Sequence, residues 1–214
     1  MMEIDIESLA RTQRYKLLTS LIVPRPIALI TTLSEGGVVN AAPFSYFNVF
    51  GEDPPIVMFS ADARASGGPK DTAANVARHK EFVVNLVDEA IAEQMHGCAV
   101  DAATQLSEIE LVGFTTTPSE RVRPPRIVQS PVSLECTLHT QLDFDTRQLF
   151  IGQIRWMHVR EGIIDPSTLR RVADVYRPVG RLYANRYCRT ADEFTLDNSA
   201  YATAANAQSA IRMF

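Results

Sequence analysis

The sequence predicts a mainly β protein of the α+β class, an antiparallel barrel with a few covering helices. Three observations support this prediction. Segments with strand character outnumber helical segments, the turns between them are short, and apolar residues alternate with polar ones over "VSLECTLHTQL" at 132–142. Alternation of this kind is typical of a strand with one buried face.

The other strands are recognised by β-branched residues between turn signals. "PIALITTL" at 26–33 stops at the turn "SEGG", and "VVNAAPFS" follows as its hairpin partner. Further strands are expected at 54–61, 81–87 and 148–159. On the last of these we expect Phe150, Ile154, Trp156 and His158 to share one face, because side chains alternate along a strand.

Three helices are expected around these strands. The first is a short amphipathic helix within 3–20, which ends before Pro24 and Pro26. The second covers "DTAANVARH" at 71–79, where Asp71 and Thr72 offer capping oxygens, and the third covers 88–97. From residue 190 onward the chain is rich in Ala and Asn with little apolar periodicity. We expect this segment to be an arm against a partner subunit or a disordered end.

Composition narrows the function classes. A chain of 214 residues fits one domain, and its net charge of −4 gives no general attraction to nucleic acid. No apolar run approaches the roughly 20 residues of a membrane span, and "MMEIDIESLA" lacks the basic start of a secretory signal. Its three cysteines lie far apart, which favours reduced thiols. We therefore expect a cytoplasmic protein without nucleic-acid or membrane partners.

Several catalytic motifs are absent. The chain has no GxSxG elbow, no GxxxxGK[ST] phosphate loop, no GxGxxG after a strand and no HExxH. These absences disfavour hydrolase, nucleoside triphosphatase and Rossmann functions. His96 and Cys98 are close in sequence, but no second pair follows at ligand spacing, so a packed helix end is the better interpretation and no metal site is predicted.

An anion site is indicated by "SADARASGGPKDTAAN" at 60–75, where a strand leads through a glycine-containing loop into a helix. The first amides of a helix lack intrahelical partners and carry the positive end of the helix dipole. Arg64 and Lys70 would match the charge of a bound phosphate. The alternative is that Asp71 or Thr72 merely caps a surface helix and that Lys70 is solvated.

A second segment, "NAAPFSYFN" at 40–48, suits a flat ring. Ala41 and Ala42 are small enough for a ring to approach the backbone, and Asn40, Ser45 and Asn48 bring hydrogen-bonding groups. The alternative is that the aromatic residues of this segment simply pack the core. Together, the two segments predict one ligand with a planar head and a phosphate tail.

In their order along the chain, several motifs resemble the flavin reductase-like FMN-binding split-barrel family, a group that includes flavoredoxins. They are "RPIALITT" (25–32), "NAAPFSYFN" (40–48), "DPP" (53–55), "KDTAAN" (70–75), "FVVNLV" (82–87), "IGQIRWMHV" (151–159) and "PVGRLYANRY" (178–187). The resemblance implies a six-stranded Greek-key split β-barrel over 15–187. We expect an N-terminal helix or lead-in at 1–14 before it and a C-terminal arm at 188–214 after it, which would wrap a partner subunit or be disordered. The resemblance also implies a homodimer with FMN near the subunit interface.

Carried over by position, the resemblance assigns the flavin ring and phosphate contacts. The resemblance implies that the isoalloxazine ring is lined by Thr32, Asn40, Ala41 and Ser45, that the phosphate is held by Ser60, Arg64, Lys70 and Thr72, and that the ring is flanked by Arg181 and Tyr187. The residue patterns above add Ala42, Asn48 and Asp71 to the expected cofactor-binding residues. His158 is similar to the family's histidine on the strand that faces the flavin, and is the catalytic candidate. Where the family often has Gly-Gly, this chain has Tyr183-Ala184, which would narrow the substrate approach.

The function implied is an FMN-dependent oxidoreductase that takes hydride from NADH or NADPH. It would reduce free flavin for a partner oxygenase or reduce a small-molecule acceptor. Backbone amides near 41–42 are the candidate donors to the reduced ring. Two alternatives remain: a flavoredoxin-like electron carrier that does not use nicotinamide itself, and a split-barrel binding module without redox function.

Overall fold

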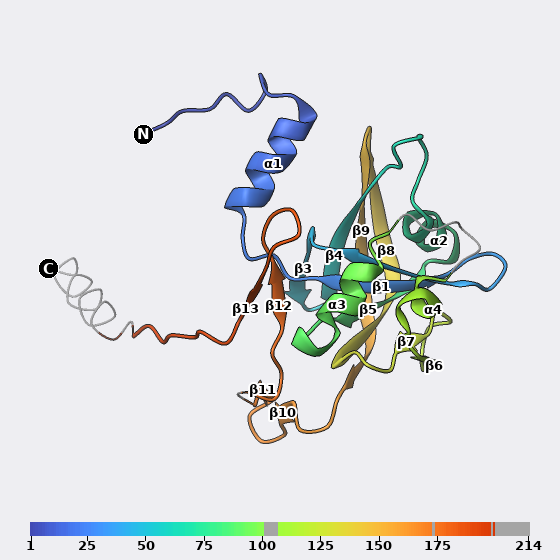
Figure 1. Ribbon diagram of the computed structural model, residues 1–214. Helices are drawn as coiled ribbons and strands as arrows, with labels where there is room; N and C mark the ends of the chain where they lie inside the picture. Colours follow the sequence, from blue (N-terminus) through green and yellow to red (C-terminus); the bar gives the residue numbers. More distant parts are fainter. Residues whose placement is uncertain (101–106, 173, 198, 200–214) are drawn as a thin grey trace, which may run out of the picture.

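A seven-stranded antiparallel sheet forms the body of the protein (Figure 1). The computed structural model describes residues 1–100, 107–172, 174–197 and 199. In the sheet the strands lie in the order β2-β1-β5-β8-β9-β4-β3. Their bounds are β1 Ala28–Leu33, β2 Val39–Phe44, β3 Phe47–Glu52, β4 Pro55–Asp62, β5 Glu81–Leu86, β8 Val132–Phe144 and β9 Arg147–Val159.

Helices and short two-stranded pairs surround this sheet (Figure 1). The helices are α1 Arg11–Leu21, α2 Asp71–His79, the 3-10 helix η1 Glu89–Ile91, α3 Ala92–Gly97 and α4 Glu108–Val112. The short pairs are β6 Thr116–Thr117 with β7 Arg126–Ile127, β10 Ile164–Asp165 with β11 Arg170–Arg171, and β12 Val179–Arg181 with β13 Tyr187–Arg189. None of the helices in the described part of the chain is both long and apolar enough to span a bilayer.

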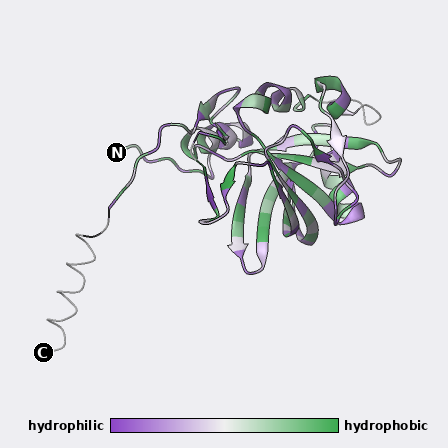
Figure 2. Ribbon diagram, turned by 90° about the horizontal axis from the view of Figure 1, so that it is seen from below, coloured by the Kyte–Doolittle hydropathy of each residue, from purple (hydrophilic) through white to green (hydrophobic). Residues whose placement is uncertain are grey.

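The curled sheet separates two apolar cores, because successive side chains of each strand point to opposite faces. Figure 2 shows the resulting alternation of hydrophobic and hydrophilic bands along the strands. Inside the barrel, Phe59 packs against Phe82 and Phe150 with ring centroids 5.3 Å and 4.9 Å away. On the outer face, Leu29 belongs to a second core that packs under α3 and α4, while its neighbour Ile30 points inward.

Most of the expected elements are confirmed. The antiparallel hairpin of β1 and β2, the helix at 71–79 and the strands near 54–61, 81–87, 132–142 and 148–159 are all present. The helix at 88–97 is divided into η1 and α3. The sheet has seven strands rather than six, because residues 47–52 add the edge strand β3 against β4.

The N-terminal helix lies in the later part of the expected range and differs from the expectation in packing. It begins at Arg11, because the side chain of Gln13 accepts a hydrogen bond of 2.9 Å from the Ala10 amide and closes the first turn there. Within the helix only Thr19 is buried, so α1 does not present an apolar face to the core as an amphipathic helix would. At the other end of the chain, residues 200–214 of the expected C-terminal arm lie outside the described residues.

A bulge in β9 overturns the expected grouping of its side chains. Glu135 of β8 lies opposite Trp156, but the next residue, Cys136, lies opposite Ile154, so β9 has one extra residue between them. Because one inserted residue reverses the alternation, Trp156 and His158 are turned to the face opposite that of Ile154. The prediction that they share the face of Phe150 and Ile154 is therefore wrong.

Candidate functional site

A cavity opens beside the N-terminus of α2, where β2, the loop after β4 and the start of α4 meet. Its enclosed part has a volume of about 130 Å³. The lining residues are Asn40, Ala42, Pro43, Phe44, Arg64, Lys70, Asp71, Thr72, Cys98, Ala99, Val100 and Glu108. The fold thus brings the two segments at 40–48 and 60–75, which the sequence singles out, to one site.

The N-terminus of α2 is suited to an anion. Lys70 occupies the N-cap in an extended conformation, and its side chain makes no capping hydrogen bond. The orphan amides of the first turn and the helix dipole therefore face the cavity without a competing acceptor from the cap residue. Gly67 and Gly68 both have positive φ, the conformation that lets the preceding loop turn tightly.

The Arg64 side chain bonds to residues of its own loop and of the helix start. Its Nη2 lies 2.6 Å from a carboxylate oxygen of Asp71, and its Nε donates to the carbonyl of Pro69 over 3.1 Å. The Asp71 carboxylate therefore neutralises the charge of Arg64, one of the two cations that the sequence predicts would bind an anion. Lys70, at the start of the helix, also lines the cavity. Unlike Arg64, it forms no ion pair with the residues that the structure describes.

A row of hydrogen bonds fixes the wall between β2 and α2. The side-chain Nδ2 of Asn40 donates to Thr72 Oγ1 over 2.9 Å and to Thr32 Oγ1 over 3.2 Å. The side-chain Nδ2 of Asn75 donates to the same Thr32 oxygen over 3.0 Å. Thr32 is fully buried behind the cavity. Because the Thr72 hydroxyl accepts from Asn40, its own proton remains available to donate to an anion.

The backbone amides near 41–42 are not free, contrary to the expectation. The Ala41 amide donates over 3.0 Å to the carboxylate of Glu108, a buried side chain that lines the cavity. In an antiparallel pair successive residues direct their amides to alternate sides, so the Ala42 amide points toward β1. Sequence reasoning missed Glu108, because nothing local marks a carboxylate that meets its partner 67 positions away.

Three other expected contacts lie away from the cavity lining. Ser45 occupies the bend between β2 and β3. Asn48 is exposed on β3, where its side-chain oxygen accepts from the next amide along the chain. Ser60 accepts a hydrogen bond of 3.2 Å from Arg147, a residue that the sequence analysis did not select.

Arg181 and Tyr187 form a separate cluster on the hairpin of β12 and β13. The guanidinium of Arg181 hydrogen-bonds to the Tyr187 hydroxyl and lies 4.8 Å from the centre of its ring. His96 Nδ1 is 2.8 Å from the same hydroxyl. Burial raises the pKa of Tyr187, while the positive charge of Arg181 opposes that rise.

The sequence-adjacent pair His96 and Cys98 is divided between these places. His96 contacts Tyr187, whereas Cys98 lines the cavity. In the part of the chain that the structure describes, no group of three His, Cys, Asp or Glu side chains could hold a metal ion. Cys98, Cys136 and Cys188 are all free thiols.

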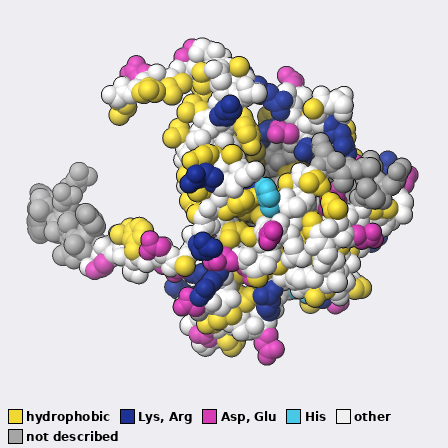
Figure 3. Space-filling view, in the orientation of Figure 1, with side chains coloured by type: hydrophobic (Ala, Val, Ile, Leu, Met, Phe, Trp, Pro, Cys, Tyr) yellow, Lys and Arg dark blue, Asp and Glu magenta, His cyan; other side chains and the backbone are white. Residues whose placement is uncertain are grey.

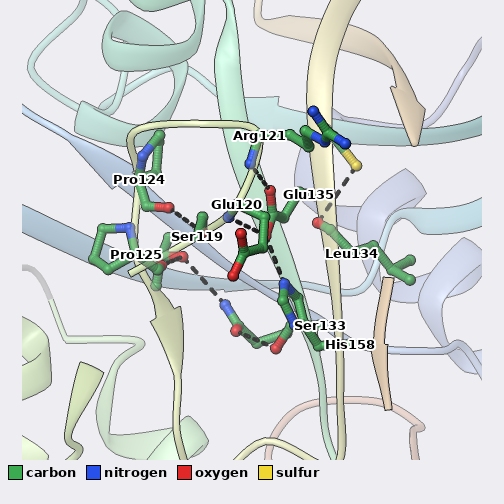
Figure 4. Close-up of polar contacts among 12 residues, drawn as sticks. Ser119, Glu120, Arg121, Pro124, Pro125, Ser133, Leu134, Glu135 and His158 are labelled. Carbon is green, nitrogen blue, oxygen red and sulfur yellow. Dashed lines mark hydrogen bonds and ion pairs between the residues drawn. The ribbon is translucent and has the colours of Figure 1, made fainter. Parts of the chain in front are cut away.

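His158 contacts a buried carboxylate rather than the cavity (Figure 4). Glu135, which is fully buried, accepts hydrogen bonds of 2.6 Å from His158 Nε2, 2.8 Å from the Glu120 amide and 2.6 Å from the Arg121 amide. Burial alone would raise the pKa of Glu135, but these hydrogen bonds outweigh it and lower that pKa. His158 therefore helps hold the 119–125 loop against β8, and its catalytic role stays a prediction.

Comparison with known proteins places this chain in a family. The model of the flavin reductase like domain matches residues 20–190. The chain belongs to the flavin reductase-like family. A relative from Bacillus subtilis, the uncharacterized protein YwrF, is 38% identical over 196 residues, which cover 89% of this chain and 95% of YwrF.

Solved structures of similar proteins have the same split-barrel fold. The 2-nitrobenzoate 2-nitroreductase NbaA of Pseudomonas fluorescens is 42% identical, with a TM-score of 0.83 over 92% of this chain and 95% of its own. Component B of a nitrilotriacetate monooxygenase from Bacillus cereus is 32% identical, with a TM-score of 0.86 over 92% and 98%. A Shewanella frigidimarina protein described as a flavin reductase with a split barrel domain is 20% identical, with a TM-score of 0.77 over 90% and 95%. The expectation of a split barrel in this family is confirmed.

Proposed function

We propose that this protein is an FMN-binding oxidoreductase, a reductase that uses NADH or NADPH to reduce free flavin or a small-molecule acceptor. Bound FMN would accept a hydride from the nicotinamide and supply two electrons to the acceptor. The observation that carries the proposal is the cavity at the uncapped start of α2, in a chain that belongs to the flavin reductase-like family. Its residues fit a phosphate-tailed ligand better than a neutral one.

The phosphate would lie against the first turn of α2. Lys70 supplies a positive charge there, and the Thr72 hydroxyl, held by Asn40, supplies a donor. Backbone amides of the first helical turn add donors that no side chain of the N-cap occupies. The ring would then extend along Ala42, whose small side chain leaves room beside β2.

A second subunit would complete the site. Ligand pockets usually have volumes of about 300–1,000 Å³, and the enclosed part of this cavity, about 130 Å³, is smaller. Val49 and Phe50 are 62% and 58% exposed on the edge strand β3, which leaves an apolar strand edge open for another chain. Both observations support the homodimer that we propose, and we propose a cytoplasmic location for it.

The acceptor has two candidate classes. NbaA, at 42% identity, is a 2-nitrobenzoate nitroreductase, which favours a small-molecule acceptor. The Bacillus cereus relative, at 32% identity, is a component of a nitrilotriacetate monooxygenase, which favours reduced flavin delivered to a partner oxygenase. A flavoredoxin-like carrier and a non-redox binding module are the alternatives that the experiment below separates.

An absorption spectrum of the purified protein, before and after anaerobic addition of NADH or NADPH, tests ligand and reaction together. We expect a bound-flavin spectrum that bleaches with nicotinamide and not with buffer. A flavin spectrum that bleaches only with a chemical reductant would instead identify an electron carrier. A colourless protein that takes up no added FMN would reject both redox functions.

The phosphate position is tested by replacing Lys70 and Thr72 with alanine. Lys70→Ala removes a charge-assisted contact to the phosphate, and Thr72→Ala removes a polar one. We therefore expect each substitution to lower FMN affinity by about tenfold or more in a fluorescence titration. Lys16→Ala, which removes an exposed lysine on α1, is the matched control and should bind FMN normally. Equal affinity of the double variant and this control would place the phosphate elsewhere.

A further inference from the structure

A groove separates α1 from the sheet and is distinct from the cavity at α2. We define it as the α1 groove, with a volume of about 800 Å³. It is lined by Arg11, Thr12, Arg14, Tyr15, Leu18, Ile22, Tyr46, Asp62, Thr146 and Arg147. Its volume lies within the range of pockets that hold small organic ligands. Figure 1 shows α1 standing beside the barrel rather than packing on it.

Contacts at both ends hold α1 over this groove. Near its start, Arg11 lies 3.4 Å from the carboxylate of Asp62 on β4. Near its end, the buried guanidinium of Arg25 donates to the carbonyls of Thr19 over 2.8 Å and Ile22 over 2.6 Å, and to that of Leu182. The space between these anchors is therefore part of the fold and not a gap beside a loose helix.

The groove combines an aromatic and aliphatic wall with an excess of positive charge. Tyr15, Leu18 and Ile22 line it from α1 and are 51%, 41% and 60% exposed, so their apolar surfaces have no partner among the described residues that buries them. Figure 3 shows hydrophobic side chains interspersed with Lys and Arg on the α1 side of the molecule. Opposite α1, Tyr46 adds a second aromatic ring to the wall.

Three arginines line the groove against one carboxylate. Arg147 lies 2.6 Å from Asp62 and over the ring of Tyr46, with 4.6 Å to its centroid, and Arg11 shares the same carboxylate. The Arg14 guanidinium also lines the groove, and its side chain forms no ion pair or hydrogen bond with the residues that the structure describes. Formal charges of +3 and −1 leave an excess of +2, which favours an anion.

We propose that the α1 groove binds an aromatic carboxylate, with its ring against the tyrosines and leucine and its carboxylate on Arg14 and Arg147. Arginine holds a carboxylate through paired N–H donors, and aromatic rings pack well against tyrosine. The binding of this ligand does not depend on the proposed function. A role of the ligand as the electron acceptor does rest on it.

Calorimetric titration of the FMN-loaded protein with benzoate and benzamide tests the binding. We expect benzoate to bind and benzamide, which has the same shape without the charge, to bind at least tenfold more weakly. Arg14→Gln should weaken benzoate about tenfold, the loss expected for one charge-assisted hydrogen bond, whereas Arg14→Lys should retain most of the affinity. Arg155→Gln, at an exposed arginine outside the groove, is the matched control and should change nothing.

Two results would overturn the inference. One is an absence of benzoate binding, or equal binding by the wild type and Arg14→Gln. The other is a Leu18→Glu variant that sediments as a smaller species than the wild type and yet binds benzoate as tightly as the wild type does. In that case the apolar wall of the groove would be an interface between copies of the chain and not a benzoate site. If the protein retains no FMN but benzoate binds as described, the proposed function fails and the groove assignment stands.

Discussion

Replacing Glu135 with glutamine probes the most completely buried carboxylate of the described chain. Its two oxygens accept three hydrogen bonds, from His158 and from the amides of Glu120 and Arg121. Glutamine keeps the shape, but it has one acceptor oxygen and brings an NH₂ group toward donors. At least one of the three donors then loses its partner.

The expected cost follows from these contacts. A hydrogen bond to a charged group contributes about 1.5–3 kcal/mol, and a buried donor left without a partner costs about 1–3 kcal/mol. For Glu135→Gln we therefore expect the free energy of unfolding to fall by roughly 3 kcal/mol. In a domain of this size that corresponds to a decrease of about 6–12 °C in Tm.

The pH dependence has a defined sign. Because the pKa of Glu135 is lowered in the folded protein, its ionised form stabilises the fold above the unfolded pKa, about 4.3 for glutamate. That contribution is lost as pH falls through the lower folded-state pKa. The difference in unfolding free energy between wild type and Glu135→Gln should be constant above about pH 5 and shrink below about pH 4.

Urea unfolding followed by far-UV circular dichroism, repeated from pH 3.5 to 7, measures both effects. Glu161→Gln, at an exposed glutamate, is the matched control and should change stability by less than about 0.5 kcal/mol. A loss in Glu135→Gln no larger than in this control would refute the reasoning. So would a difference that does not depend on pH.

Three further predictions concern packing and reactivity. Gly152→Ala should destabilise by about 1–3 kcal/mol in the same assay, because its Cβ would lie 2.3 Å from a ring atom of Phe82, whereas Gly36→Ala meets nothing closer than 3.9 Å and should be nearly neutral. Arg25→Ala should make α1 an early site of limited proteolysis, since the guanidinium anchors its end; unchanged cleavage would contradict this role. Burial raises the pKa of the Cys98 thiol to about 12, so iodoacetamide at pH 8 should label it only after unfolding, as peptide mapping would reveal.

The candidate site was predictable where its chemistry is local. Lys70 and Thr72 stand beside each other at a helix start, and both the helix and its orphan amides follow from capping and propensity rules. Asn40 was recognised as a polar group within a strand of small residues. Its actual partners, Thr32 and Thr72, depend on how β1, β2 and α2 pack together.

Other features of the site could not be predicted, because they depend on register or on distant contacts. One extra residue in β9 turned His158 toward Glu135, and no sequence pattern marks that bulge. The Ala41 amide was expected to meet a ligand but meets Glu108, which lies on a helix that the sequence analysis did not predict. Arg147, which connects Ser60 and Asp62, likewise became visible only through strand pairing.

The sequence by itself determined the antiparallel strands, the helix at 71–79 and the family, because periodicity, turn residues and ordered motifs are properties of neighbouring residues. Only the tertiary structure decided which side chains share a cavity, which amides already have partners, and that α1 encloses a groove over Tyr46 and Arg147. Those features arise from contacts between residues far apart in the chain, whose geometry is set by packing of the whole sheet.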